Sequence, residues 1–254
     1  MKKYHFTFDK TKKNESFNKI LLNKYKNYPA HLSDVIIVLG GDGFMLQTLK
    51  KYQKYNKPFY GINSGTVVFL MNKFKNFNID IRISKAKLVS ISPLQMKVLT
   101  KSGKIFFAIA INEVSLLRQT RQTSLLKIEY GKRILIKKLF CDGVLVSTPA
   151  GSTAYNLSVG GPILSLNSKK IAVTPISPFR PRRWKGRVFS ASTLVKITNL
   201  NVQKRSVSAV ADNIEIRNIK KVSIKVNSKI KFKLLYDKNI SLIKKISLEK
   251  RMKQ

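Results

Sequence analysis

The chain changes its pattern near residue 90, and this change constrains the possible folds more than any other feature of the sequence. Before it, segments with strand-like and helix-like spacing of apolar residues alternate. They are YHFTF (4–8), the helical pattern of 15–28, the continuous apolar run DVIIVLG (34–40), the helical pattern of 44–55 and PFYGIN (58–63). A continuous apolar run is typical of a parallel strand that is buried on both faces. Residues 1–90 are therefore predicted to form an open, Rossmann-like α/β domain.

After residue 90 the strongest segments are short, β-rich and separated by turn residues. They cover 94–100, 104–111, 124–130, 133–140, 170–176, 193–198, 207–211, 221–226 and 231–236. Many short strands with few helices between them predict an all-β, sandwich-like domain over residues 91–238. The charged tail, residues 239–254, is expected to pack back on the N-terminal domain.

The composition limits the number of domains and indicates the cellular compartment. A chain of 254 residues with 43% hydrophobic residues is long enough for one large core or two modest cores. No stretch approaches an apolar membrane helix, and the N-terminus MKKYHFTFDKTKK lacks the apolar centre of a signal peptide. Cys141 is the one cysteine, and only His5 and His31 accompany it, so neither a disulfide nor a zinc site is expected. We expect a cytoplasmic protein without a membrane partner.

The net charge of +38 would attract any polyanion, including nucleic acid. The lysines, however, are spread from Lys2 to Lys253 over apparent helices, strands and turns alike. The sequence contains no aromatic RNA-binding signature, no helix-turn-helix pattern and no Cys/His finger. We therefore interpret the charge mainly as a solvated lysine surface, and nucleic acid is not the partner we expect.

The first candidate site is GGDG (40–43), which directly follows the apolar run of 34–40. Glycines after a strand let a phosphate approach the backbone, and the N-terminus of the next helix supplies N–H donors and partial positive charge. The stretch is neither a Walker A loop nor a dinucleotide fingerprint. Asp42 places a carboxylate beside this anion site, where it could accept a proton, bind Mg²⁺ or form a hydrogen bond with a hydroxyl. Alternatively, Asp42 is an ordinary turn-forming residue.

Two further candidate sites lie in the second half of the chain. Asn112 and Glu113 follow the apolar segment 104–111, where they could contact sugar hydroxyls or simply end a strand. The run DGVLVSTPAGSTAYNLSVGGP (142–162) combines glycines with short hydroxyl side chains, which suits a nucleotide but could also be a structural loop. A serine hydrolase with Ser152 as nucleophile is disfavoured, because A-G-S-T-A is not G-x-S-x-G and both histidines lie far away in the sequence.

Together these motifs and their order resemble one family, the NAD kinases. The resemblance rests on GGDG (40–43), GINSG (61–65), the NE pair (112–113) and the long run of 142–162, and it covers about residues 34–215. It implies transfer of the terminal phosphoryl group of ATP to the 2′-hydroxyl of the adenosine ribose of NAD, which gives NADP. It also implies Mg²⁺ or another divalent metal with ATP, no tightly bound organic cofactor and a homo-oligomer, either a dimer or a tetramer.

The resemblance also assigns roles to residues. Asp42 would be the catalytic base or would orient the reacting hydroxyl. A well-placed base accelerates such a reaction by roughly 10² to 10⁴. The expected NAD-binding residues are Asp42, Gly43, Asn112, Glu113, Asp142, Ala150, Thr153, Ala154, Tyr155, Asn156, Leu157, Ser158 and Asn213. The expected phosphate-donor residues are Gly40, Gly41, Gly43, Asn63 and Gly65, and no residue is assigned as a protein ligand of a metal. Part of the NAD site would come from a neighbouring subunit.

Two alternatives from other classes remain at this point. Lipid kinases of the diacylglycerol or sphingosine type share the GGDG turn and a similar two-domain layout. The STPAGSTAY stretch and the absence of a strongly apolar segment for lipid capture argue against them. A basic nucleic-acid-binding protein that merely retains the fold is the second alternative.

Overall fold

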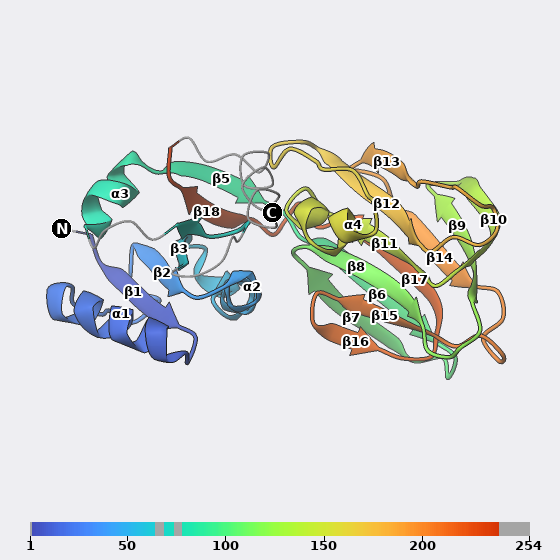
Figure 1. The fold of residues 1–254 in the computed structure, drawn as a ribbon, viewed down its shortest axis with the longest axis horizontal. Coiled ribbons are helices and arrows are strands. Elements are labelled where there is room, and N and C mark those ends of the chain that lie inside the picture. The colour runs from blue at the N-terminus through green and yellow to red at the C-terminus, as the bar shows by residue number, and fades with distance from the viewer. Residues whose placement is uncertain (1, 64–68, 74–77, 239–254) are drawn as a thin grey trace, which may run out of the picture. The chain divides into compact units, whose positions relative to one another are not determined.

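A computed structural model describes residues 2–63, 69–73 and 78–238. The chain divides into two compact units (Figure 1). Of the described residues, those up to Ile91 and those from Lys231 to Lys238 belong to unit 1, and Ser92–Ile230 form unit 2. Within the described residues, no helix has the length and apolar character needed to cross a membrane.

Unit 1 is built on a mostly parallel sheet with the strand order β1-β2-β3-β18-β5, to which β4 adds by pairing with β3. These strands are β1 (Tyr4–Phe8), β2 (Val35–Leu39), β3 (Pro58–Asn63), β4 (Asn72–Lys73), β5 (Lys87–Ile91) and β18 (Phe232–Tyr236). Pairing is parallel throughout except between β18 and β5. The helices are α1 (Lys12–Lys24), α2 (Asp42–Lys51), the 3₁₀ turn η1 (Gln53–Tyr55) and α3 (Ile79–Lys85).

The sequence of β2 explains why this sheet has a buried centre. All five residues of VIIVL are buried, as expected for a parallel strand with both faces covered. One face packs into a cluster that includes Tyr4, Phe6 and Tyr25, whose rings meet edge to face or tilted. Helix α3 begins at a cap in which the Asn78 side chain accepts a hydrogen bond from the N–H of Ile81.

Unit 2 consists of two antiparallel sheets of six strands each. One has the order β10-β9-β14-β17-β6-β7 and the other β13-β12-β11-β8-β15-β16. The first contains β6 (Leu94–Thr100), β7 (Ile105–Ala110), β9 (Ser124–Tyr130), β10 (Arg133–Cys141), β14 (Val195–Asn199) and β17 (Ile219–Val226). The second contains β8 (Glu113–Arg118), β11 (Gly143–Ser147), β12 (Lys170–Ile176), β13 (Arg187–Ser190), β15 (Val207–Ala211) and β16 (Ile214–Ile216); short turns η2 (Gly151–Thr153) and α4 (Tyr155–Ser158) follow β11.

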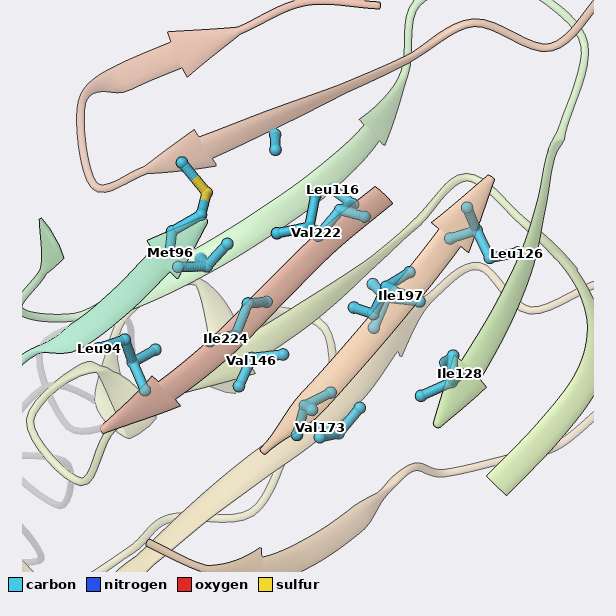
Figure 2. Packing of buried hydrophobic residues seen from close by; sticks show 14 of the residues in the cluster. Leu94, Met96, Leu116, Leu126, Ile128, Val146, Val173, Ile197, Val222 and Ile224 are labelled. Atoms are coloured by element: carbon cyan, nitrogen blue, oxygen red, sulfur yellow. The ribbon is translucent and has the colours of Figure 1, made fainter. Parts of the chain in front are cut away.

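The core of unit 2 lies between the two sheets. Leu94, Met96 and Val98 alternate along β6 so that all three point into it, as the period of two in a strand requires. Figure 2 shows residues of the first sheet, such as Ile224, beside residues of the second, such as Val146. Each fully buried aliphatic side chain of this size contributes about 1.5–3 kcal/mol. The core that the two sheets share confirms the expected β-sandwich-like domain.

The division of the chain differs from the expectation at its C-terminal end. The segment 231–236 was expected in the β-rich domain, but β18 lies in the sheet of unit 1, where it pairs with β3 in parallel and with β5 in antiparallel orientation. The expected extent 91–238 is therefore wrong beyond residue 230. The reason is that an alternating strand carries no mark of the sheet it will join. The tail 239–254, expected to pack on unit 1, lies outside the described residues.

Two details of the secondary structure also differ. The helix expected over 15–28 is α1 at Lys12–Lys24. Strands β8 and β11, central in their sheet, were not among the strongest segments of the sequence. Consequently Glu113 begins β8 instead of ending the strand before it.

Candidate functional site

The glycine turn of unit 1 lies at the carboxyl edge of the parallel sheet. Gly40 follows the last residue of β2, and its N–H donates to the carbonyl of Ile62 in β3 at 3.2 Å. Gly41 is the residue before α2, and Asn63 ends β3 at the same edge. A Cβ on Gly40 would stand 2.8 Å from the Asp9 carboxylate, so the chain is tight here. The glycine turn thus leads directly into the N-terminus of α2, and the anion site expected there stays a prediction.

Asp42, the first residue of α2, uses its carboxylate to hold another segment of the chain. Its Oδ2 accepts the N–H of Phe69 at 2.7 Å, and its Oδ1 accepts the N–H of Leu70 at 2.9 Å. Burial, together with the charge of Asp42, raises the pKa of Tyr236 far above its ordinary value. Both carboxylate oxygens of Asp42 are therefore fixed by the backbone of residues 69–70.

A buried polar network, not foreseen from the sequence, holds the segment that Asp42 contacts. The fully buried Asn72 donates from Nδ2 to the carbonyls of Gly61 and Leu235 at 3.0 and 2.9 Å. Its Oδ1 accepts the N–H of Asp237 at 2.9 Å. Arg82 then binds the Asp237 carboxylate and the carbonyl of Lys73 at 2.7 and 2.8 Å. No local pattern marks these residues, because they become neighbours only in the folded sheet.

In unit 2, the Asn112–Glu113 pair lies where the chain crosses from β7 in one sheet to β8 in the other. Asp212, in the β15–β16 turn with a left-handed φ of 53°, fixes this crossing. Its two carboxylate oxygens accept the N–H groups of Ile111 and Asn112 at 2.8 and 2.9 Å. Its own N–H donates to the carbonyl of Glu113 at 3.2 Å. The backbone of the pair is therefore held from the neighbouring hairpin.

The side chains of the pair carry the polar atoms that need a partner. Asn112 Oδ1 and Glu113 Oε2 are buried and have no hydrogen-bond partner among the residues that the structure describes. Burial, and then the charge of Asp212, raises the pKa of Glu113 to about 7. A buried acceptor without a donor is unfavourable, so these atoms are suited to accept a donor from a ligand.

The loop after β11 packs directly on this pair. The N–H of Thr148 donates to the carbonyl of Asn112 at 2.9 Å, and Thr148 Oγ1 donates to the carbonyl of Ile111 at 2.7 Å. Gly151 comes so close that a Cβ there would stand 2.2 Å from the Asn112 carbonyl oxygen. Only glycine permits this approach, so Gly151 brings the loop and the Asn112–Glu113 pair together.

Asn156 holds the rest of the loop in shape. Its side chain is fully buried, its Nδ2 donates to the carbonyls of Ser152 and Pro162, and its Oδ1 accepts the hydroxyl of Thr174 at 2.7 Å. Ser152 is likewise buried, with Oγ donating to the carbonyl of Pro149 at 2.7 Å, which argues further against its acting as a nucleophile. The Asn156 amide is thus occupied by the loop itself, so its expected role in NAD binding stays a prediction.

The remaining expected residues divide by exposure and position. Tyr155, Ser158 and Asn213 are exposed, Ala154 and Leu157 are half-buried, and Ala150 and Thr153 are buried. Asp142 forms an ion pair with Arg118 at 2.6 Å. In the β8–β11 register Ser147 faces Glu113 whereas Gly143 faces Leu117, so Asp142 lies beyond the opposite end of β11 from the pair. Gly43 is exposed in the first turn of α2, and Gly65 lies outside the described residues.

Family models match both halves of the chain. The ATP-NAD kinase N-terminal domain matches residues 1–85, and the ATP-NAD kinase C-terminal domain matches residues 111–236. The glycine turn with its carboxylate falls in the first match, and the Asn112–Glu113 pair with its loop falls in the second. The protein is therefore a phosphotransferase.

Similar proteins show which family of phosphotransferases the chain belongs to. NAD kinase of Brucella suis biovar 1 (strain 1330) is 43% identical over 245 residues, which cover 96% of this chain and 95% of the relative. NAD kinase of Zymomonas mobilis subsp. mobilis is 48% identical over 227 residues, which cover 89% of this chain and 88% of the relative. At this identity and coverage, the chain belongs to the NAD kinase family.

Two solved structures share the fold at low sequence identity. Yeast NADH kinase complexed with NADH has a TM-score of 0.80 at 20% identity and covers 97% of this chain and 86% of its own. An NAD kinase from Archaeoglobus fulgidus in complex with ATP has a TM-score of 0.71 at 21% identity, with coverage of 93% and 94%. These likenesses confirm the expected fold class.

Proposed function

We propose that the protein transfers the terminal phosphoryl group of ATP to the 2′-hydroxyl of the adenosine ribose of NAD and so makes NADP. The observation that carries this proposal is the similarity, over almost the whole chain, to relatives that are themselves NAD kinases. The glycine turn with Asp42 supports it, because phosphoryl transfer needs an anion site with a well-placed base and little covalent help from the protein. No observation on the described residues favours a lipid kinase or a nucleic-acid-binding protein.

On the donor side, we propose that Gly40, Gly41 and Gly43 line the site of the ATP phosphates, with Asn63 beside them. The N–H groups of Gly41 and Gly43 would donate to the phosphates, whereas the N–H of Gly40 already donates to the carbonyl of Ile62. Gly65, outside the described residues, stays a proposal from the resemblance. Asp42 accepts the proton of the attacking hydroxyl or orients it. Its hydrogen bonds to Phe69 and Leu70 support this role, because they fix the carboxylate before substrate binds.

Mg²⁺ or another divalent metal would neutralise charge on the phosphates when bound with ATP. The described residues contain no group of three or more His, Cys, Asp or Glu side chains that could hold a metal ion by themselves. They do place two carboxylates, Asp9 and Asp42, beside Gly40 and at the start of α2. This set fits Mg²⁺, which is commonly held by one or two carboxylates and by substrate phosphates.

On the NAD side, we propose that Asn112 and Glu113 accept hydrogen bonds from ribose hydroxyls or amide groups of NAD. The buried acceptors without partners on both side chains support this. The loop residues Ala150 and Thr153–Ser158 would surround the bases, with Tyr155 offering an exposed ring. Asn213 lies exposed next to Asp212 and would reach the same ligand. Asp142 lies beyond the other end of β11, which suits the proposal that it serves the site of a neighbouring subunit.

A homo-oligomer is supported by one surface of unit 2. Three consecutive residues of the edge strand β7, Ile105, Phe106 and Phe107, are 52%, 42% and 63% exposed. Phe106 and Phe107 border a groove of about 800 Å³ whose other wall includes Ile214 of the edge strand β16. Apolar residues on an unprotected edge strand favour association through that edge. We propose that a second copy covers this surface and that the enzyme works in the cytoplasm.

The test is to incubate purified protein with NAD, ATP and Mg²⁺ and to detect product with a dehydrogenase that accepts only NADP. We expect NADP from the wild type and at least a hundredfold lower turnover from Asp42→Asn, with NAD affinity retained, because the variant lacks the base. Asp34→Asn is the matched control, since this exposed carboxylate lies before β2, at the other end of the strand from the glycine turn. Absence of NADP with the wild type would refute the reaction, and a wild-type rate in Asp42→Asn would refute the role of Asp42.

A further inference from the structure

Asp212 occupies a position that the NAD-binding motifs themselves do not explain. Residues 111–112 connect β7 in one sheet to β8 in the other, so their N–H groups lie outside both sets of strand ladders. Both N–H groups donate instead to the Asp212 carboxylate, at 2.8 and 2.9 Å. Hydrogen bonds to an ionised acceptor are roughly twice as strong as neutral ones.

The turn that carries Asp212 is fastened at the same point. Its left-handed φ of 53° is a conformation that Asp and Asn tolerate better than most residues. The N–H of Asp212 donates back to the carbonyl of Glu113, and β15 pairs with β8 from Ala211 and Val114 onward. Asp212 is therefore bound to the Asn112–Glu113 segment both through its carboxylate and through its own backbone N–H.

We propose that Asp212 is a positioning residue for NAD: its carboxylate fixes the peptides of Ile111 and Asn112 and thereby aims the unpartnered side-chain oxygens of Asn112 and Glu113 at the ligand. The inference rests on the proposed contact of these two side chains with NAD. Asp212 itself need not touch the ligand.

The same carboxylate also acts on Glu113 through its charge, which gives the inference a distinctive signature. Burial is the larger cause of the raised pKa of Glu113, about 7, and repulsion by Asp212 is the second. Asp212 is the one charged group among the causes of this shift, and the residue paired with Glu113 across the strands, Ser147, is uncharged. Replacing Asp212 by a neutral residue should therefore lower the pKa of Glu113 while leaving part of the rise in place.

The test measures NAD affinity by titration calorimetry from pH 5.5 to 8.5 for wild type, Asp212→Asn, Asp212→Gly and Glu113→Gln. Both Asp212 variants suit a left-handed turn, so the hairpin should keep its shape. We expect NAD affinity to fall about tenfold or more in both, since two N–H groups lose a charged acceptor, with the KM for ATP unchanged. We also expect the pH dependence of NAD affinity, with a midpoint near pH 7 in the wild type, to move to lower pH. Glu129→Gln, which removes a carboxylate of β9 paired with Lys127, is the control and should match the wild type.

The outcomes separate this inference from the proposed function. Wild-type NAD affinity and an unshifted pH midpoint in the folded Asp212 variants would overturn the positioning role while the reaction stands. Reduced affinity without any shift in the midpoint would assign Asp212 a merely structural effect and would also overturn it. NAD affinity and pH dependence unchanged in Glu113→Gln would instead refute the proposed contact of Glu113 with NAD, and the inference with it.

Discussion

Gly151→Ala is the smallest change that should separate the loop from the Asn112–Glu113 pair. A Cβ at residue 151 would stand 2.2 Å from the carbonyl oxygen of Asn112 and 2.4 Å from its carbonyl carbon. Real Cβ contacts essentially never fall below 3.0 Å, so one of the two backbones must move by close to an ångström. Because the obstacle is backbone, no rotamer change relieves it.

Such overpacking costs about 1–3 kcal/mol in a well-packed site. For a chain of this size, that corresponds to a fall in Tm of about 2–12 °C. The displaced group is the peptide that carries Asn112, so we expect the KM for NAD to rise at least about tenfold, since an ångström of misplacement can cost about a hundredfold. The KM for ATP should stay unchanged.

The assay combines thermal unfolding with steady-state kinetics in which each substrate is varied in turn. A control for the loop as a whole is Ser158→Ala, an exposed position with open surroundings, whose Tm should match that of the wild type. If Gly151→Ala keeps both the Tm and the KM for NAD of the wild type, the close approach to Asn112 does not hold the site together and the reasoning fails.

Three further predictions concern other parts of the molecule. Glu113→Gln should become more stable relative to the wild type as the pH rises from about 4.5 to 7, by at most about 3 kcal/mol. The reason is that a buried acid with a raised pKa opposes folding once it is ionised in the unfolded chain. Urea unfolding at pH 5 and pH 8 checks the sign, and an equal difference in the free energy of unfolding at both pH values would contradict this prediction. Asn72→Ala should lower the free energy of unfolding by about 3 kcal/mol or more, because the carbonyls of Gly61 and Leu235 and the N–H of Asp237 lose their partner. A loss under about 1 kcal/mol in urea unfolding would show that water replaces the amide. Phe107→Asp should reduce the mass of the assembly measured by light scattering, whereas Lys132→Asp on the exposed β9–β10 turn should leave it unchanged. An unchanged mass in Phe107→Asp would show that the interface does not include this strand.

The fold class could be predicted from the sequence because the two halves carry different periods. The run VIIVL and the glycines after it specify a buried parallel strand and a tight entry to α2, and both signals are local. The membership of β18 could not be predicted in this way. Its alternation matches that of its neighbours in the sequence, and only the parallel pairing of Leu234 with Phe59 decides which sheet it joins.

The same limit applies to the candidate site. Asp42, Asn112 and Glu113 could be singled out because each stands directly after an apolar segment. The groups that hold them could not: Asn72 reaches Asp237 across 165 residues, and Asp212 reaches Asn112 across 100. Contacts of this separation depend on strand order, which is fixed by the whole sheet and leaves no pattern near either residue.

The hydroxyl groups of the loop after β11 have a different physical role from the one that the sequence suggests. Thr148, Ser152 and Asn156 suggest a surface full of donors and acceptors for a nucleotide, yet all three are buried and bond to the protein's own backbone or to Thr174. Their polar groups satisfy backbone that glycine and proline leave without regular partners. If the loop binds NAD as proposed, it would therefore present mainly its shape and backbone, and recognition would rest on the few side chains outside this network. Substitution of a buried hydroxyl in the loop should consequently lower stability and NAD affinity together, whereas substitution of Tyr155 should lower affinity alone.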